Sequence, residues 1–274
     1  MTKSGMISRL GSNIHYWVDG PEKGPVIVFS HGATLDHHSF DAQVSPLIEK
    51  GYRVVTWDMR GHGCSTPIGS KITIEVLADD LLAIIDEIGA EKVILVGHSF
   101  GGYVVQEYVY KHPNRVNAVA IIGCTNIAKK PAAFYRLLYS IMPKMLNRME
   151  IETFRKRTML DLSLHDSVKS YAAQAMKHIS KEDFIAITMA GVAAMWIDSG
   201  IPSDYTIPVP FLLTHGDSDQ ANGRVFHRQS PKWAARESNC RYEIIPKAGH
   251  TAQMDNSIAF NHVLIDFLQN NLGA

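Results

Sequence analysis

Cysteine is scarce in this sequence, and charge of neither sign dominates it. The three cysteines, Cys64, Cys124 and Cys240, are too few and too scattered for a disulfide framework or a zinc site, so we expect reduced thiols. Lysine plus arginine and aspartate plus glutamate number 27 each, which leaves no overall field that favours nucleic acid or an anionic membrane. We therefore expect no nucleic-acid partner.

Long apolar runs and phosphate-binding motifs are also missing. No stretch approaches the roughly 20 apolar residues that a membrane-spanning helix needs. Residues 1–10 contain Lys3 and Arg9 without an apolar run behind them, unlike a secretory signal. No G-x-x-x-x-G-K-[ST] sequence occurs, and residues 97–102 do not match G-x-G-x-x-G, so nucleotide binding is not supported. These absences predict a soluble, cytoplasmic protein.

Short β-rich runs alternate with helical patterns over most of the chain. The strand candidates share about five mostly β-branched or apolar residues bounded by glycine or proline, as strands buried on both faces require. They are residues 25–29, 53–57, 92–96, 117–122, 209–214 and 241–245. Helical periodicity marks residues 74–88, 104–110 and 257–268. This alternation predicts an α/β fold with a mostly parallel, doubly wound sheet.

Two segments differ from this pattern. At the N-terminus, residues 7–10 and 14–18 flank Gly11-Ser12-Asn13, which predicts a hairpin with a tight turn at 11–13. Residues 126–205 have helical patterns and no convincing strand, so we expect a helical cap inserted into a core domain of residues 1–125 and 206–274. Seven of the eleven methionines fall in this insertion, among aromatic residues. They either pack the insertion onto the core or line an apolar pocket.

The motif that points most directly to chemistry is Gly97-His98-Ser99-Phe100-Gly101. It fits G-x-S-x-G and stands between a predicted buried strand and a helix opening near Tyr103, where a sharp turn would expose the serine hydroxyl. Glycines two positions on either side would let neighbouring backbone pass without a clash. We predict that Ser99 is a nucleophile.

A serine nucleophile needs a base and a group that orients the base. His250 is the best placed of thirteen histidines, because it follows the last predicted strand, whose end faces the crevice of a doubly wound sheet. The loop after residue 214 contains two carboxylates, Asp217 and Asp219. We favour Asp219 as the acid that orients His250, and Asp217 remains the alternative.

Acyl transfer also needs donors aimed at the developing oxyanion. The backbone N–H of Phe100, directly after the nucleophile, is one candidate. The second is the N–H of Ala33, in the loop Ser30-His31-Gly32-Ala33 that follows the first parallel strand.

These motifs together resemble the α/β-hydrolase superfamily, over nearly the whole chain. The order Ser99, Asp219, His250 matches that family, and residues 216–219 fit its usual G-x-x-D acid motif, which supports Asp219. Residues 58–65, DMRGHGCS, are similar to the D-x-R-G-x-G-x-S stretch of its esterase and haloperoxidase-like branches. The resemblance implies an α/β-hydrolase fold. The sequence of the insertion matches no branch, so the substrate is not indicated.

The leading functional hypothesis is a serine hydrolase that cleaves a carboxylic ester, or a lactone, of a small and largely apolar substrate without a cofactor. The same triad also serves perhydrolysis and carbon–carbon bond hydrolysis, and some relatives act as small-molecule receptors. Aspartate-nucleophile branches are disfavoured because position 99 is serine. Asp36-His37-His38, with His31 and His62, lacks the spacing of a metal site, so we expect no metal.

Overall fold

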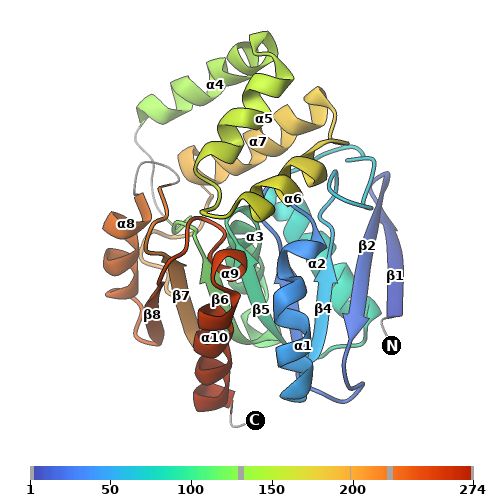
Figure 1. The fold of residues 1–274 in the computed structure, drawn as a ribbon, viewed down its shortest axis with the longest axis vertical. Coiled ribbons are helices and arrows are strands. Elements are labelled where there is room, and N and C mark those ends of the chain that lie inside the picture. The colour runs from blue at the N-terminus through green and yellow to red at the C-terminus, as the bar shows by residue number, and fades with distance from the viewer. Residues whose placement is uncertain (1–2, 129–132, 198, 221–224, 273–274) are drawn as a thin grey trace.

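The computed structural model describes residues 3–128, 133–197, 199–220 and 225–272. An eight-stranded sheet with the order β1-β2-β4-β3-β5-β6-β7-β8 forms its centre (Figure 1). The strands are β1 (Lys3–Arg9), β2 (Ser12–Asp19), β3 (Val26–Ser30), β4 (Arg53–Trp57), β5 (Val93–His98), β6 (Val116–Ile122), β7 (Phe211–Gly216) and β8 (Cys240–Ile245). Pairings from β4 to β8 are parallel, and β2 pairs antiparallel with β1 and β4. The predicted fold class is confirmed.

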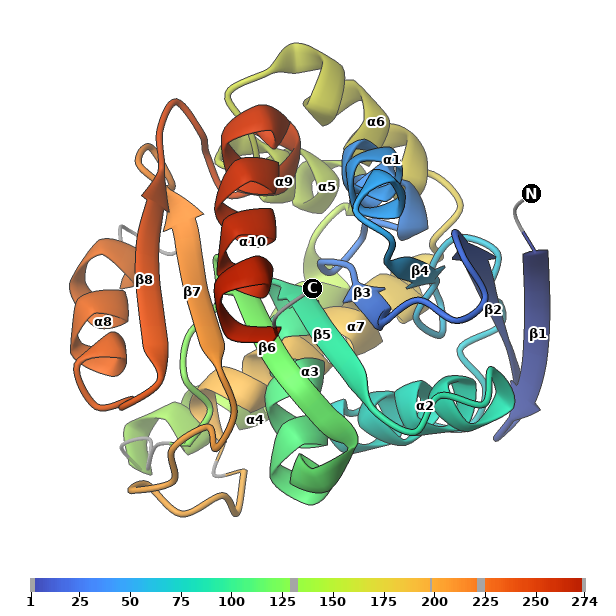
Figure 2. The same ribbon diagram turned by 90° about the horizontal axis from the view of Figure 1, so that it is seen from below.

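Helices cover both faces of the sheet, as its strands buried on two sides require. Figure 2 shows α2 (Ile74–Glu87) and α3 (Phe100–Lys111) on one face, with α1 (Asp41–Glu49) and α10 (Ser257–Leu272) on the other. A short 3-10 helix, η1 (His37–Phe40), precedes α1, another, η2 (Pro113–Arg115), precedes β6, and α9 (Ala252–Asp255) precedes α10. The last remaining core helix, α8 (Val225–Ala234), lies beside β8. Two large apolar clusters, one on each face, form the core.

The segment between β6 and β7 is helical wherever the structure describes it. It contains α4 (Ala133–Arg148), α5 (Ile151–Leu160), α6 (Asp166–Met176) and α7 (Lys181–Trp196). These helices lie together at the top of the molecule in Figure 1, beyond one end of the parallel strands. Within the described ranges, no helix has the length and apolar character that a bilayer-crossing segment needs.

Two local predictions need correction. The hairpin turn consists of Leu10 and Gly11, both with positive φ, while Ser12 already pairs with Arg9. The alternating burial along β2, which points Ile14 toward the core, sets this register and overrides the turn preference of Ser12. Helix α3 begins at Phe100 and not near Tyr103, so its first turn directly adjoins Ser99.

Candidate active site

Ser99 lies at the sharp turn between β5 and α3. Its backbone has φ 50° and ψ −112°, a conformation that residues other than glycine rarely adopt. This conformation projects the half-buried serine out of the strand. The flanking glycines make this turn possible. A Cβ at Gly97 would lie 2.6 Å from the carbonyl oxygen of Gly101, and a Cβ at Gly101 would lie 2.1 Å from that of Ser30. Both distances are impossible without moving backbone.

The structure brings Ser99, His250 and Asp219 together in one hydrogen-bonded chain. Nε2 of His250 lies 2.9 Å from Oγ of Ser99, and Nδ1 of His250 lies 3.0 Å from Oδ2 of Asp219. Because the carboxylate of Asp219 can only accept a hydrogen bond, a neutral His250 must carry its proton on Nδ1. Its Nε2 then presents a lone pair to Oγ of Ser99. Asp219 is fully buried and His250 is 9% exposed, so the pair is largely shielded from water.

Asp217, the alternative acid, points elsewhere. It is exposed, and its carboxylate accepts hydrogen bonds from the backbone N–H groups of Lys247 (2.9 Å) and Ala248 (3.2 Å) and from Oγ of Ser218 (2.9 Å). Burial acts to raise the pKa of Asp217, but these donors outweigh it and lower the pKa. Asp217 thus ties the loop after β7 to the loop that carries His250.

The two predicted oxyanion donors are the backbone N–H groups of Phe100, the first residue of α3, and Ala33, in the loop after β3. The N–H of Gly101 donates to the carbonyl of His31 (3.0 Å), which holds the loop after β3 against the first turn of α3. In the described part of the chain, no hydrogen bond uses the N–H of Ala33 or of Phe100. Because the first amides of a helix have no partner within it, the Phe100 N–H is free to meet negative charge next to Ser99.

Two residues that the sequence analysis did not assign also contact His250. The ring of Phe226, from α8, stacks on the imidazole with the centroids 5.5 Å apart. His98, the second residue of the G-x-S-x-G motif, donates from Nε2 to the carbonyl of His250 (3.0 Å). Burial holds the pKa of His98 well below its usual value, so His98 is a neutral clamp on the loop of His250. The sequence signal that could have identified His98 is its position next to Ser99 in the G-x-S-x-G motif.

The comparisons with known proteins agree with the fold. The family described as alpha/beta hydrolase fold matches residues 25–150. A bifunctional esterase/perhydrolase from Acinetobacter calcoaceticus is 39% identical over 112 residues, 41% of each chain. A non-heme haloperoxidase from Rhodococcus erythropolis is 25% identical over 272 residues, 90% of this chain and 93% of that protein. The structure of an enol-lactonase from Burkholderia xenovorans superposes with a TM-score of 0.79 at 23% identity, covering 97% of this chain and 100% of the other.

The chain has the α/β-hydrolase fold, and its residues 25–150 match the model of that family. Chain order, sheet order and the strand–serine–helix turn are all those of an α/β hydrolase. The first of these relatives matches over less than half of its own length, so that likeness describes only the shared part.

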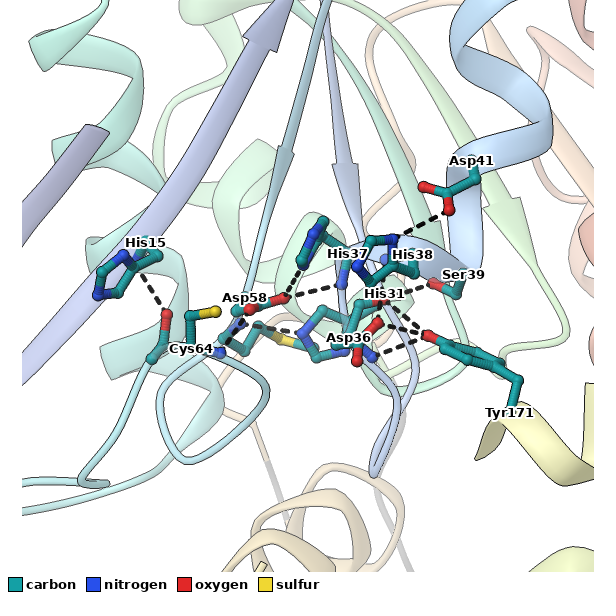
Figure 3. A network of polar contacts seen from close by, with 12 residues as sticks. His15, His31, Asp36, His37, His38, Ser39, Asp41, Asp58, Cys64 and Tyr171 are labelled. Carbon is teal, nitrogen blue, oxygen red and sulfur yellow. Dashed lines mark hydrogen bonds and ion pairs between the residues drawn. The ribbon is translucent and has the colours of Figure 1, made fainter. Parts of the chain in front are cut away.

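In this α/β hydrolase, the stretch of residues 58–65 supports the loop that carries Ala33. The fully buried carboxylate of Asp58 accepts hydrogen bonds from the backbone N–H groups of His37 (2.8 Å) and Cys64 (2.7 Å) and pairs with Nδ1 of His37 (2.8 Å). His31 spans the same two loops, because its Nε2 accepts from the N–H of Met59 (2.9 Å). Figure 3 shows Asp58 at the centre of this network.

The Asp58–His37 pair shifts both pKa values. Burial alone would lower the pKa of His37, but the hydrogen bond and charge of Asp58 outweigh it and raise the pKa. Burial would raise the pKa of Asp58, and the hydrogen bond from His37 with nearby positive charge lowers it. Each shift favours the charged form of its group. The His37 ring also stacks on Trp17, with the centroids 3.6 Å apart.

Arg60, from the same stretch, has a purely structural environment. Its guanidinium forms two hydrogen bonds of 2.7 Å to the carboxylate of Asp80 on α2, and both side chains are fully buried. The remaining nitrogen donates to the carbonyls of Ile68 and Lys71. The arginine of the D-x-R-G motif therefore anchors the loop to α2 and forms no hydrogen bond with Ser99, His250 or Asp219 in the described structure.

The helical insertion contacts the candidate site on three sides: the start of α3, the loop of His250 and the loop after β3. Gly191 of α7 lies against the Phe100 ring: a Cβ added to Gly191 would be 3.4 Å from Cδ2 of Phe100. The carbonyl of Leu162 accepts from the N–H (3.0 Å) and Oγ1 (3.1 Å) of Thr251, the neighbour of His250. On the third side, the hydroxyl of Tyr171 donates to Oδ1 of Asp36 (2.6 Å), as Figure 3 shows.

A cavity of about 390 Å³ lies between α7 and the core. Its lining is mostly apolar and includes Ile72, Ile127, Tyr139, Met189, Ala190 and Ala194. The two expectations for the methionines of the insertion therefore both hold in part. Met176 packs in a buried cluster with Phe184, whereas Met189 lines the cavity. Met145 does neither, because it is 62% exposed.

The histidines considered as metal ligands are held by other partners. His37 pairs with Asp58, His38 lies at the surface with Asp41 (3.0 Å), and His62 contacts the carbonyl of Arg60 (3.1 Å). Burial lowers the pKa of His31 to about 4. Among the residues whose positions are described, no group of three or more His, Cys, Asp or Glu side chains forms a metal site.

Proposed function

We propose that this α/β hydrolase cleaves carboxylic esters, lactones included, of small and largely apolar substrates through an acyl-enzyme. The observation that carries the proposal is the unbroken chain of hydrogen bonds from Oγ of Ser99 through the imidazole of His250 to Asp219. Such a chain supplies a nucleophile, a general base and a group that stabilises the imidazolium.

The first half-reaction acylates Ser99. Its Oγ attacks the ester carbonyl while Nε2 of His250 takes the hydroxyl proton, and Asp219 stabilises the resulting imidazolium. The carbonyl oxygen becomes an oxyanion, to which the N–H groups of Ala33 and Phe100 would donate hydrogen bonds. When the tetrahedral intermediate collapses, the alkoxide leaves with the proton from Nε2, and the acyl group stays on Ser99.

The second half-reaction releases the acid. His250, again neutral, takes a proton from water as its oxygen attacks the acyl carbon, and the proton then returns to Oγ of Ser99 as the carboxylic acid departs. No redox partner or metal enters these steps, so the proposal requires no cofactor.

We assign residues 126–205 as a cap on a core of residues 1–125 and 206–274. The contacts of Gly191, Leu162 and Tyr171 with the loops of the site support this assignment. The apolar acyl or alcohol group of the substrate is proposed from the methionine and aromatic content of the insertion. The cavity beside α7 does not carry this point, because Ser99 and His250 are not among its lining residues. Preference for small charged substrates would contradict this assignment.

Perhydrolysis is the second candidate, because the Acinetobacter calcoaceticus protein is described as both an esterase and a perhydrolase. In that reaction hydrogen peroxide replaces water as the nucleophile on the acyl-enzyme and the product is a peracid. The same residues would serve, so the two reactions differ only in the second half-reaction. Peracid formation at the expense of acid, measured with added peroxide, separates them.

The test is steady-state hydrolysis of p-nitrophenyl esters of increasing chain length by the intact protein and by Ser99→Ala. We expect turnover that Ser99→Ala abolishes, with a chain-length optimum that reports the depth of the pocket. A fluorophosphonate should phosphonylate Oγ of Ser99 with loss of fluoride, which mass spectrometry detects. Matched thermal denaturation curves would exclude misfolding of the variant. Absence of turnover, or turnover that survives Ser99→Ala, would reject the proposal and leave carbon–carbon hydrolysis or a receptor role to be tested.

A further inference from the structure

Helix α4 carries an apolar stripe on its outer face. Phe134, Leu137, Ile141 and Met145 are 62%, 62%, 43% and 62% exposed. They are three, four and four residues apart, which places them within about 80° of the helix circumference. The opposite face packs on α7, where Leu146 is buried. Figure 1 shows α4 at the top of the molecule, on the side away from the sheet.

The charged residues of α4 itself are all positive, and the acidic residues Glu150 and Glu182 lie beyond its C-terminal end. Helix α4 contains Arg136, Lys144 and Arg148 and no acidic residue. Lys181 adds a fourth cation, because its Nζ donates to the carbonyl of Asn147 (2.8 Å) near the C-terminal end of the helix. The balanced charge of the whole chain thus conceals a local basic surface.

The next helix, α5, does not cancel this charge. Lys156 and Arg157 are exposed, and the carboxylate of Glu152 is paired with Arg155 (2.6 Å). Arg155 itself is tied to the carbonyl of Ile179 (2.8 Å), so it is a structural residue. The exposed surface of α4 and α5 therefore combines apolar side chains with cations that form no ion pair with any residue whose position is described.

We propose that the stripe of α4 docks on an anionic lipid bilayer and lies in the plane of its surface. An exposed apolar face flanked by Lys and Arg, with aromatic residues at one end, is the pattern of an interfacial helix. Phe134 and Tyr135 supply that aromatic end, and Tyr135 is 40% exposed. The cations would meet lipid phosphates while the stripe enters the boundary between headgroups and acyl chains.

A second copy of the chain fits this face less well. In a twofold contact the same patch meets itself, so Lys144 and Arg148 of each copy would face the cations of the other. Like charges brought together without counterions oppose such a contact, whereas an anionic surface attracts them. The charge pattern thus favours lipid as the occupant.

The experiment is flotation of the full chain with vesicles of phosphatidylcholine, with and without phosphatidylglycerol, at low and high salt. We expect binding to the anionic vesicles that weakens with salt and falls strongly on neutral vesicles. Leu137→Asp/Ile141→Asp should abolish binding. Lys144→Glu/Arg148→Glu should weaken binding to anionic vesicles at least tenfold, since each basic residue near the surface contributes about fivefold in affinity.

Ile258→Asp is the matched control, because Ile258 is 85% exposed on α10, outside the stripe. It should leave flotation unchanged, and thermal denaturation would show that all variants fold, since the substituted side chains are exposed. Absence of binding to either vesicle, or equal binding by Leu137→Asp/Ile141→Asp, would overturn the proposal. A concentration-dependent dimer that the same double variant dissociates would also overturn it, in favour of a second copy.

Discussion

Asp219→Asn, in the loop after β7, should nearly abolish turnover, whereas Asp217→Asn in the same loop should not. In Asp219→Asn the new amide can donate to Nδ1 of His250, where the carboxylate accepted at 3.0 Å. The imidazole would then carry its proton on Nε2, facing Ser99, and could not take the hydroxyl proton. In serine hydrolases this change costs about 10⁴ in kcat, or about 5 kcal/mol of transition-state stabilisation.

Asp217→Asn is the matched control, because it makes the same chemical change two residues away. Asp217 is exposed and accepts from two backbone N–H groups and one hydroxyl. The new amide keeps one acceptor oxygen, so we expect a loss of about 1 kcal/mol of stability and less than about tenfold in kcat.

The assay is kcat for a p-nitrophenyl ester with both variants, beside far-ultraviolet circular dichroism and thermal denaturation to establish folding. The informative outcome is the ranking of the two variants. If Asp217→Asn lost about 10³-fold while Asp219→Asn stayed within about tenfold, Asp217 would be the orienting acid and the assignment from geometry would be wrong.

Three further predictions concern the loops that support the site. Gly101→Ala should abolish turnover and lower Tm by more than about 5 °C, because the new Cβ would lie 2.1 Å from the carbonyl oxygen of Ser30 at the end of β3. Normal activity in this variant would show that the turn at Ser99 does not require a glycine at position 101. Arg60→Met should cost about 3 kcal/mol in urea denaturation, since it removes the bidentate partner of the buried Asp80 and leaves only Arg9 (3.0 Å). Arg60→Met/Asp80→Leu should recover part of that loss, and a double variant with no recovery would contradict the role of the Arg60–Asp80 pair. Finally, because the pKa of His37 is raised in the folded protein, its pair with Asp58 stabilises the fold fully below the unfolded pKa of about 6.5, and this stabilisation is lost as pH rises through the folded pKa. The difference in unfolding free energy between the intact protein and His37→Gln should therefore shrink from about pH 6 to pH 9. A difference that grows over this range would show that the pKa of His37 is lowered and not raised.

Much of the fold was predictable because its signals are local. Apolar β-branched runs and helical periodicity mark the core elements, and the glycines around Ser99 indicate the turn. The hairpin turn at Leu10 and Gly11 was misplaced because pairing of β2 with the sheet, and not turn composition, sets its register. The start of α3 at Phe100 was likewise missed, since helix onset at this turn depends on its contacts with the loop after β3.

The sequence by itself determined the residue types of the candidate site and their order along the chain, because a nucleophile, a base and an acid must follow particular strands. Only the tertiary structure showed that Asp219 lies within hydrogen-bonding distance of His250 and that Asp217 bonds the backbone of Lys247 instead. It also disclosed the clamp from His98, which acts across 152 positions, and the exposed stripe of α4. These features depend on which loops converge and which helix faces stay uncovered, and local sequence patterns contain neither.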